Sequence, residues 1–390
     1  MRVLQLYSNY KWTGPADLAL LQTKALMEHA PEVDVRFALS AWTHPGEVHA
    51  MRRRAEELGL DCVEGLQLRR HYHLPTILGD ASRLARLVDD EKLDVLHCHQ
   101  SGDHFLAALA AGQAVRRVAI VRSFWEERIP LRVGRMLFAF QRSDALIGPF
   151  AGRVRALGQR FDLPAGRVHL LPPILDASFD LPSAEERDSA RRSLLSEFGI
   201  EGEPFLIGLT ARIQRKRRWD LAWDTIQELV RKVPAARLCV LGRPDEGVFD
   251  EICRAPVMRR GLSEQVLFLG YRRGAEYRRA LAAFDAFLFL VAGSDATSRA
   301  LREAMASGLP PVVTDAAPLP EIVGEGRFGA LSAADPAQLA RALRELAESP
   351  DLRAERSARA REAAMAWSDA AAQAAALSRI YVQAREGYPG

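Results

Sequence analysis

The chain has 390 residues, more than the roughly 250 to 300 at which a single hydrophobic core usually stops growing, so two domains are expected. Its composition, 48% apolar and 26% charged, is typical of a globular protein, and no apolar run approaches the ~18 residues of a membrane span. The net charge of +3, from 53 basic and 50 acidic side chains, gives no argument for nucleic acid as a partner.

The cysteines and the amino-terminal sequence indicate the cellular setting. The four cysteines show no paired metal-type spacing, so we expect neither disulfides nor a structural zinc site. The opening MRVLQLYS has the alternation of a first strand and lacks the pattern of a secretory signal. We therefore expect a cytoplasmic protein.

Short runs rich in Val, Ile, Leu and Phe alternate with segments of helical spacing, a pattern typical of parallel strands joined by crossover helices. The first half contains six such runs, at 2–7, 33–39, 94–99, 118–124, 145–150 and 168–172. The second half contains five, at 205–211, 236–242, 266–271, 286–291 and 310–315. This order predicts an α/β protein with two doubly wound sheets.

The boundary between the two sets of strands falls in a polar segment. Residues 177–203 begin with a Pro-containing turn and contain no strand-like run. We predict a first domain over 1–185 and a second over 186–367. The last segment, 368–386, has apolar residues at helical spacing with two aromatic residues nearby, so it needs a surface on which to pack.

The turn after the first strand, YSNYKWTGPADL, lacks the GxGxxG pattern that binds dinucleotides. This absence argues against a nicotinamide-dependent dehydrogenase.

The stretch GSDATSRALREAMASGLPPVVTD leads from a strand into a helix that Gly308 ends. Thr297 and Ser298 stand at the start of this helix, where unpaired N–H groups and the helix dipole favour a phosphate. Glu303 lies roughly 9 Å further along at ~1.5 Å per residue, a distance that suits the ribose of a nucleotide. Asp295, in the loop, would then lie beside the group on the distal phosphate. The spacing fits a sugar nucleotide.

Alone, Asp295 would be interpreted as a helix cap and Glu303 as a solvated helix residue. A second cluster favours the functional interpretation, because Arg212, Lys216 and Arg217 follow the first strand of the second domain in ARIQRKRRWDLA. The ends of adjacent parallel strands meet at one crevice, so these cations could reach the same diphosphate.

These motifs carry a resemblance to a known family. Residues 204–385 resemble glycosyltransferase family four, retaining sugar-nucleotide transferases of the GT-B architecture, through ARIQRKRRWDLA, VLFLGY and EAMASGLPPVVTD followed by LPEIV. The pair Asp295 and Glu303 matches the family's Glu-seven-Glu motif. The first half matches more loosely, through DVLHCHQ and VHLLPPILD. The implied fold is GT-B, two Rossmann-like doubly wound domains facing across a cleft, with the last helix bracing the first domain.

The resemblance also implies roles for particular residues. The diphosphate would be bound by Arg212 and Arg217 with support from Lys216, and the ribose by Glu303. The base would meet Gly270 and Tyr271, and the distal phosphate the N–H groups near Thr297 and Ser298. Catalysis would rest on Asp295, Arg212 and Arg217. The two arginines would stabilise the leaving diphosphate by their charge, and Asp295 would face the sugar. No metal or other cofactor would be obligatory.

Several positions depart from the family pattern. Asp295 replaces a Glu, and the first domain's glycine loop is reduced to Thr13, Gly14 and a proline. Trp125 stands where relatives place a sugar-facing His, which leaves the donor sugar open. His97 and His99 would share one face of a strand. The resemblance favours His99 on the acceptor side, and the alternative is an ordinary pair of strand-end histidines.

Residues 116–160 contain ten Arg against two Glu and one Asp. Such a basic and apolar surface suits an anionic membrane or a lipid-linked acceptor, at ~1 kcal/mol per cation near the surface. The alternative is a helix packed on its sheet with a solvated basic face. If the surface binds lipid, the protein would be peripheral at the inner membrane face.

The sequence therefore predicts a retaining glycosyltransferase that moves a sugar from a nucleoside diphosphate sugar to a hydroxyl of a saccharide or glycolipid acceptor. Surface polysaccharide or glycolipid synthesis is the setting the family suggests. Two alternatives remain open: an epimerase or phosphorylase on the same fold, and a sugar-nucleotide-binding protein without catalytic activity.

Overall fold

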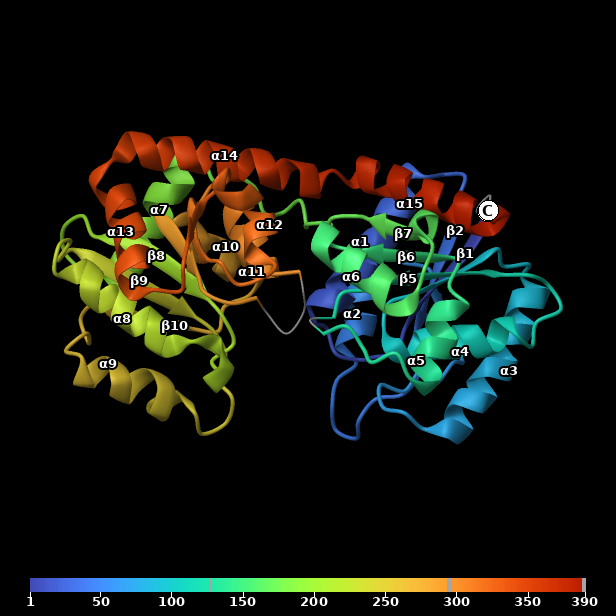
Figure 1. The fold of residues 1–390 in the computed structure, drawn as a ribbon. Helices are drawn as coiled ribbons and strands as arrows, with labels where there is room; N and C mark the ends of the chain where they lie inside the picture. Colours follow the sequence, from blue (N-terminus) through green and yellow to red (C-terminus); the bar gives the residue numbers. More distant parts are fainter. Residues whose placement is uncertain (127, 293–296, 388–390) are drawn as a thin grey trace. The chain divides into compact units, whose positions relative to one another are not determined.

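The computed structural model describes residues 1–126, 128–292 and 297–387, which form two compact units (Figure 1). Unit 1 contains Met1–Ile174, Thr297 and the carboxyl-terminal segment from Asp369 onward, and unit 2 contains the other described residues between Leu175 and Ser368. Each unit has its own parallel sheet with helices on both faces. The α/β class predicted from the sequence is confirmed.

The sheet of unit 1 has seven strands among the described residues, all parallel, in the order β3-β2-β1-β4-β5-β6-β7. The strands are β1 (Arg2–Tyr7), β2 (Asp34–Leu39), β3 (Cys62–Val63), β4 (Val95–Cys98), β5 (Ala119–Ser123), β6 (Ala145–Gly148) and β7 (Val168–Leu170). The helices are α1 (Gly14–His29), α2 (Ala50–Glu57), α3 (Leu74–Asp90), α4 (Ser101–Ala111), α5 (Gly134–Gln141), α6 (Ala151–Phe161) and α15 (Ala370–Glu386).

Two hydrophobic cores cover the faces of this sheet. On one face, α1 and α15 pack side by side against the central strands through Leu18, Leu26, Leu377 and Tyr381. On the other face, α3 and α4 contribute their own buried apolar side chains. Because the strands are buried on both faces, they are nearly continuous apolar runs, as expected for a parallel sheet.

The sheet of unit 2 has six parallel strands among the described residues, in the order β10-β9-β8-β11-β12-β13. The strands are β8 (Phe205–Thr210), β9 (Ala236–Leu241), β10 (Val266–Gly270), β11 (Ala286–Phe289), β12 (Pro311–Thr314) and β13 (Ala330–Ser332). The helices are α7 (Ala184–Phe198), α8 (Trp219–Val230), α9 (Ala255–Arg259), α10 (Gly274–Ala282), α11 (Arg299–Ala306), α12 (Leu319–Ile322), α13 (Pro336–Glu348) and α14 (Pro350–Ser368).

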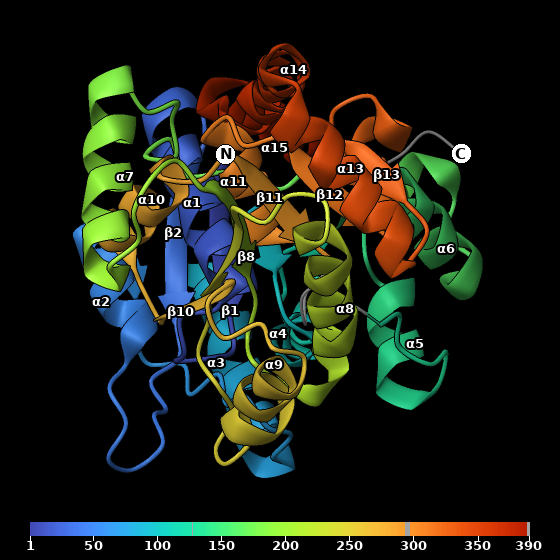
Figure 2. The same ribbon diagram turned by 90° about the vertical axis from the view of Figure 1, so that its left-hand side faces the viewer.

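In unit 2, α8 and α13 pack together over one face of the sheet, and α7 and α10 cover the other (Figure 2). The stacked rings of Trp219 and Trp223, with centroids 5.4 Å apart, lie in the core under α8. The strand order reverses at β8 and β11, which run side by side at the centre of the sheet. In open α/β sheets, ligands bind beyond the carboxyl ends of the strands at such a switch point.

The observed division between the units differs from the predicted one. The contacts divide the chain between Ile174 and Leu175, whereas the sequence placed the boundary at 185. The connecting segment belongs to unit 2 because Phe179 packs edge-on against Tyr277, with ring centroids 6.0 Å apart, and Asp180 pairs with Arg361. These two contacts could not be predicted from the polar composition of the segment.

Two strands were absent from the prediction. Both β3 and β13 are at sheet edges and contain only two and three residues, too few for a hydrophobic pattern to be recognised. No helix among the described residues is both long and apolar enough to cross a membrane.

Candidate functional site

The loop after β8 carries the predicted cluster of cations. It runs through a short 3₁₀ turn (Arg215–Arg217) before α8 begins. Arg217 is half-buried and donates from Nη1 to the carbonyl oxygen of Ala292 at 2.6 Å. Ala292 follows β11, so this hydrogen bond joins the loops that leave the two central strands. The structure thus places Arg217 at the switch point of the sheet.

Arg212 has a different partner from Arg217. Its Nε donates to Oδ1 of Asp245 at 2.8 Å, and Gln214 donates to Oδ2 of the same carboxylate at 2.9 Å. These contacts, the Gln214 hydrogen bond first, lower the pKa of Asp245 below its usual value. The Arg212 side chain is largely exposed, so its bond to Asp245 can be exchanged for a ligand at little cost. Lys216 is exposed in the same loop.

The start of α11 has the features of a phosphate site. Ser298 precedes the helix in the left-handed conformation, with φ of 46°, which is uncommon for a residue other than glycine. Its side chain is 2% exposed, and its Oγ has no hydrogen-bond partner among the described residues. Thr297, just before it, is fully buried. A buried hydroxyl beside the open N–H groups of a helix start suits an oxyanion.

Glu303 lies inside α11 and is almost completely buried, at 4% exposure. Its Oε1 accepts a hydrogen bond from Nε of Arg299, one turn earlier, at 2.5 Å. Tyr277 of α10 lies nearby and bonds to the hydroxyl of Thr210, at the end of β8, at 3.3 Å. Burial raises the pKa of Tyr277 well above its usual value, and the charge of Glu303 adds to this effect. Thus α10, α11 and the end of β8 converge around one carboxylate.

The remaining residues predicted to bind the donor are also at the carboxyl edge of this sheet. Gly270 is the last residue of β10, is exposed, and has a φ of 71° that glycine adopts without strain. Tyr271 follows it and exposes 56% of its surface, with the guanidinium of Arg273 4.6 Å from its ring centroid. An exposed ring beyond a strand end can stack on a base. Asp295 lies outside the described residues.

Unit 1 places its predicted residues at the carboxyl edge of its own sheet. Thr13 precedes α1 without a capping hydrogen bond from its side chain, and its Oγ1 lies 3.1 Å from the hydroxyl of Tyr7, the last residue of β1. Gly14 opens the helix and Pro15 occupies its first turn. The glycine loop of the family is thus replaced here by a helix start.

The histidines of β4 share one face, as predicted, with ring centroids 4.3 Å apart. His99 is fully buried, with Nε2 2.7 Å from Oε1 of Gln5. Burial lowers the pKa of His99 well below its usual value, and His97 and Arg122 add to the effect. His99 is therefore neutral at physiological pH. Because it is fully buried, His99 could contact an acceptor only after the residues that cover it moved away.

Trp125 lies in the core of unit 1 and has no exposed surface. It packs among Val121, Ile147 and Leu171, together with residues of α15. A direct contact between this ring and a sugar would require the side chain to leave that core. The structure therefore gives no support for Trp125 as a sugar-contacting residue, and its packing explains why an aromatic side chain occupies the position.

Two residues of the second unit were not singled out from the sequence. Arg299 holds Glu303, and the only signal for it is the spacing of four residues within one helix. Tyr277 comes from a distant helix, and its position beside Glu303 depends on how α10 packs, which no local pattern reveals.

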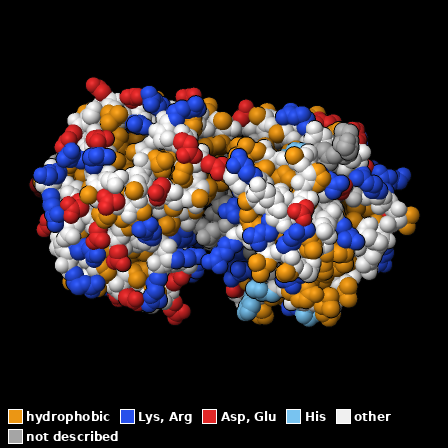
Figure 3. Space-filling view, viewed as in Figure 1, with side chains coloured by type: hydrophobic (Ala, Val, Ile, Leu, Met, Phe, Trp, Pro, Cys, Tyr) orange, Lys and Arg blue, Asp and Glu red, His pale blue; other side chains and the backbone are white. Residues whose placement is uncertain are grey.

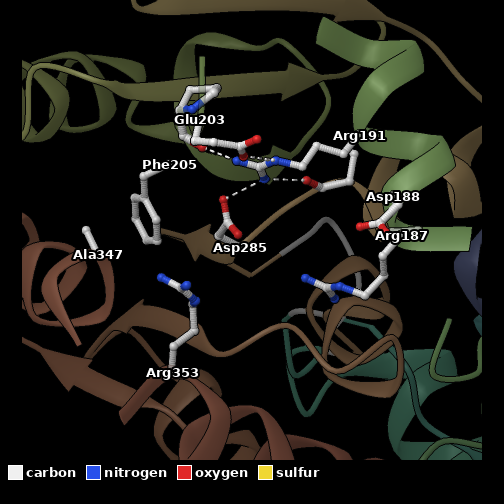
Figure 4. A pocket seen from close by; sticks show the side chains of 11 residues that line it. Arg187, Asp188, Arg191, Glu203, Phe205, Asp285, Ala347 and Arg353 are labelled. Atoms are coloured by element: carbon white, nitrogen blue, oxygen red, sulfur yellow. Dashed lines mark hydrogen bonds and ion pairs between the residues drawn. The ribbon is translucent and has the colours of Figure 1, made fainter. Parts of the chain in front are cut away.

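A cavity of about 390 Å³ lies at the other edge of the second sheet (Figure 4). Arg191 crosses it to pair with Asp285 at 3.0 Å and Glu203 at 3.3 Å. Asp285 comes just before β11 and Phe205 begins β8, so the cavity lies at the amino ends of the strands. It is separate from the predicted donor residues.

Comparisons with known proteins agree with this architecture. In structure, the chain is similar to HepE from Anabaena in complex with UDP, with a TM-score of 0.79 at 17% identity, covering 98% of this chain and 100% of that one. It is also similar to a glycosyltransferase from Rickettsia africae, with a TM-score of 0.78 at 10% identity and 98% coverage of both chains. The two units are therefore the two Rossmann-like domains of a GT-B protein.

Family models match both halves of the chain. The model described as glycosyl transferases group 1 matches residues 204–349, and the model described as glycosyltransferase family 4 matches residues 24–179. The chain belongs to the family-four glycosyltransferases of GT-B fold. The resemblance inferred from its motifs is confirmed.

Two curated proteins are similar to part of the chain in sequence. N-acetyl-alpha-D-glucosaminyl L-malate synthase of Bacillus anthracis is 26% identical over 270 residues, which is 66% of each chain. The putative glycosyltransferase EpsF of Bacillus subtilis is 27% identical over 252 residues, which is 62% of each chain. The match thus spans less than two thirds of the length of these relatives.

Proposed function

We propose that the protein is a retaining glycosyltransferase that moves a sugar from a nucleoside diphosphate sugar, with UDP as the carrier, to a hydroxyl group of an acceptor. The observation that carries this proposal is the group of residues at the switch point of the second sheet. Arg217 is fixed beside the end of β11, Ser298 holds a buried hydroxyl at the start of α11, and Glu303 lies inside that helix. Family membership and UDP-bound neighbours support this interpretation.

In this proposal the positive charge at the site replaces a metal ion. Arg217, with Arg212 and Lys216 from the same loop, would neutralise the departing diphosphate, and the N–H groups at the start of α11 would bind its distal phosphate. Glu303 would accept hydrogen bonds from the ribose hydroxyls while Arg299 holds it in place. Asp295 would face the sugar. The reaction would then proceed in EDTA as fast as without it.

The acceptor is proposed to be a saccharide or a glycolipid in surface polysaccharide or glycolipid synthesis, the setting that family membership suggests. Peripheral membrane association on the cytoplasmic side would accompany a lipid-linked acceptor. Leu131 and Val133 expose 68% and 61% of their surfaces beside Arg132 and Arg135. Figure 3 shows hydrophobic side chains gathered on unit 1 over the region of α3 and α5, with basic side chains at their margin.

The test combines binding with product analysis. We expect UDP to raise the melting temperature, and a labelled UDP-sugar incubated with candidate acceptors to yield a glycoside whose anomeric configuration, read by NMR, equals that of the donor. Arg217→Gln should reduce UDP affinity about tenfold or more, because it removes a charge-assisted contact worth about 1.5–3 kcal/mol. Arg231→Gln, an exposed arginine of the same unit, is the matched control.

Other outcomes would contradict the proposal. Conversion of the donor sugar without an acceptor would indicate an epimerase. Tight binding of the UDP-sugar, with neither sugar transfer nor slow hydrolysis of the donor, would indicate a binding protein without catalytic activity.

A further inference from the structure

A second cavity, of about 120 Å³, lies in unit 1 between the segment before α3, the start of α4 and the start of α5. Ser8 follows β1, and Ser101 and Gly102 begin α4 after β4, so the cavity is at the carboxyl edge of the first sheet. One wall is apolar and consists of Leu68, Ile77, Phe105 and Leu106.

Three arginines line this cavity: Arg69, Arg70 and Arg135. In the described part of the chain, none of them pairs with a carboxylate. Arg69 lies 5.2 Å from the ring centroid of Trp42, and Arg135 lies 4.5 Å from that of Tyr72. Stacking on a ring orients a guanidinium group but leaves its N–H donors, which point outward in the plane of the guanidinium group, unused. The cavity therefore presents cationic donors that lack a protein acceptor.

The two carboxylates in the lining do not neutralise these arginines. Asp80 is 1% exposed and accepts hydrogen bonds from the backbone N–H groups of Gln67 at 3.1 Å and Leu68 at 3.0 Å. Asp103 is fully buried and accepts from the backbone N–H groups of Gln100 at 2.7 Å and Ser8 at 3.2 Å. Both carboxylates are held by backbone donors, and Asp80 also pairs with Arg83 at 3.2 Å. The three arginines outnumber the two carboxylates, so the lining carries a net positive charge.

The amino terminus of α4 adds neutral donors to the same space. This helix has 11 residues and a capping box in which the Gln100 side chain accepts from the N–H of Asp103. The N–H groups of Ser101 and Gly102, the first two residues, have no acceptor within the helix. Gly102 keeps the turn free of a side chain, because a Cβ there would lie 3.0 Å from Oγ of Ser8. Ser8 and Ser101 are also among the lining residues, and the hydroxyl of Ser101 donates to Oε1 of Glu126 at 3.4 Å. Guanidinium and amide donors thus surround one small volume beside an apolar wall.

We propose that this cavity binds an oxyanion, a phosphate or carboxylate, carried by the acceptor, with an adjoining ring or aliphatic part against Leu68, Ile77 and Phe105. Its role in acceptor selection rests on the proposed glycosyl transfer, whereas the binding of the oxyanion does not. A neutral acceptor would leave three guanidinium groups without a counter-charge, and an anionic one receives bidentate hydrogen bonds from them. The protein is therefore specific for acidic acceptors.

The direct test is calorimetric titration of the full chain with inorganic phosphate, in the presence of UDP so that the phosphate site of unit 2 is filled. Arg70 and Arg135 are exposed, so the double variant Arg70→Gln, Arg135→Gln should fold as the parent does. We expect this variant to bind phosphate at least tenfold more weakly. Arg53→Gln, whose side chain is 80% exposed on α2, should bind as the parent does. Equal affinities of parent and double variant, or no phosphate binding by the parent, would overturn the proposal.

A second arm identifies the source of the oxyanion. Vesicles of phosphatidylglycerol are compared with vesicles of phosphatidylcholine in flotation. Loss of binding to the anionic vesicles in the double variant supports a lipid headgroup as the source, and phosphate binding without vesicle binding supports a soluble acceptor. If the double variant retains both vesicle binding and phosphate affinity, the cavity is not the oxyanion site.

Binding of UDP is measured on the same samples. A double variant that binds UDP normally but not phosphate separates the cavity from the donor site. If UDP fails to bind the parent, the proposed function fails, and a phosphate titration without UDP still decides whether the cavity binds an oxyanion.

Discussion

Glu303 is held in its position by a charge within its own helix. The Nε of Arg299 lies 2.5 Å from its carboxylate, and the carboxylate is almost fully buried beside Tyr277. A buried charge of this kind is tolerated because it is paired, and its pairing fixes the direction in which its second oxygen points. Such an oriented acceptor can bind the two hydroxyls of a ribose without first losing side-chain freedom.

Glu303→Gln tests this arrangement with little change in volume. The amide cannot replace a charged acceptor, and hydrogen bonds to charged groups contribute about 1.5–3 kcal/mol, so UDP should bind about tenfold or more weakly. Calorimetric titration of UDP measures the effect. Glu345→Gln is the matched control, because Glu345 also pairs with an arginine four residues away but is exposed. Unchanged UDP affinity in Glu303→Gln would contradict the role assigned to this residue.

At the scale of elements, the last helix completes the first sheet. Residues of α15 pack against α1 and the central strands, and the hydroxyl of Tyr381 lies 2.8 Å from Nδ1 of His97 in β4. His97 also bonds to Ser123 in β5 at 2.8 Å, so one buried ring joins three elements. The helix therefore belongs to the core of unit 1 even though it is distant in sequence.

Tyr381→Phe removes one hydroxyl from this core. It leaves a ring nitrogen of His97 without a partner, which costs about 1–3 kcal/mol of the free energy of unfolding. We expect the melting temperature of the transition that unfolds unit 1 to fall by a few degrees in calorimetry. Arg379→Gln, at an exposed position of the same helix, should leave it unchanged. An equal melting temperature for Tyr381→Phe and the parent would show that the hydrogen bond contributes nothing.

Across the molecule, ionisable groups are buried unevenly, and unit 1 contains three fully buried histidines. Burial, with Arg122 nearby, lowers the pKa of His97 to about 3 and those of His99 and His104 well below the usual value. Burial acts in the opposite direction on Asp103 and raises its pKa to about 7. The stability of unit 1 should therefore depend on pH in the range where these groups titrate in the unfolded chain.

Acidification should destabilise unit 1. Below about pH 6.5 the unfolded chain binds protons at these histidines that the folded chain does not, so stability falls as the pH decreases from 6.5. Asp103 opposes this trend between about pH 4 and 7, but three histidines outnumber it. We expect melting temperatures in calorimetry to fall from pH 7.5 to 5.5. His97→Gln should reduce this dependence, and His29→Gln, at an exposed position, should preserve it. A melting temperature that rises on acidification would show that the histidines do not control stability.

The sequence by itself determined the α/β class, the two parallel sheets and the loops that carry the residues proposed to bind the donor. Strands such as β8 and β11 are buried on both faces, so their composition marks them without knowledge of their neighbours. The cations after β8 and the helix start after β11 follow directly from strand order.

Only the tertiary structure decided which residues meet. Tyr277 lies beside Glu303 because α10 packs near α11, and the segment from Leu175 joins unit 2 through Phe179 and Asp180. Trp125 is buried because β5 and α15 enclose it, which its position in the sequence did not reveal. The arginines around the cavity of unit 1 come from the loop before α3 and from the start of α5, more than sixty residues apart. Local patterns record burial and helix starts, whereas contacts between distant segments depend on packing, which no short stretch of sequence specifies.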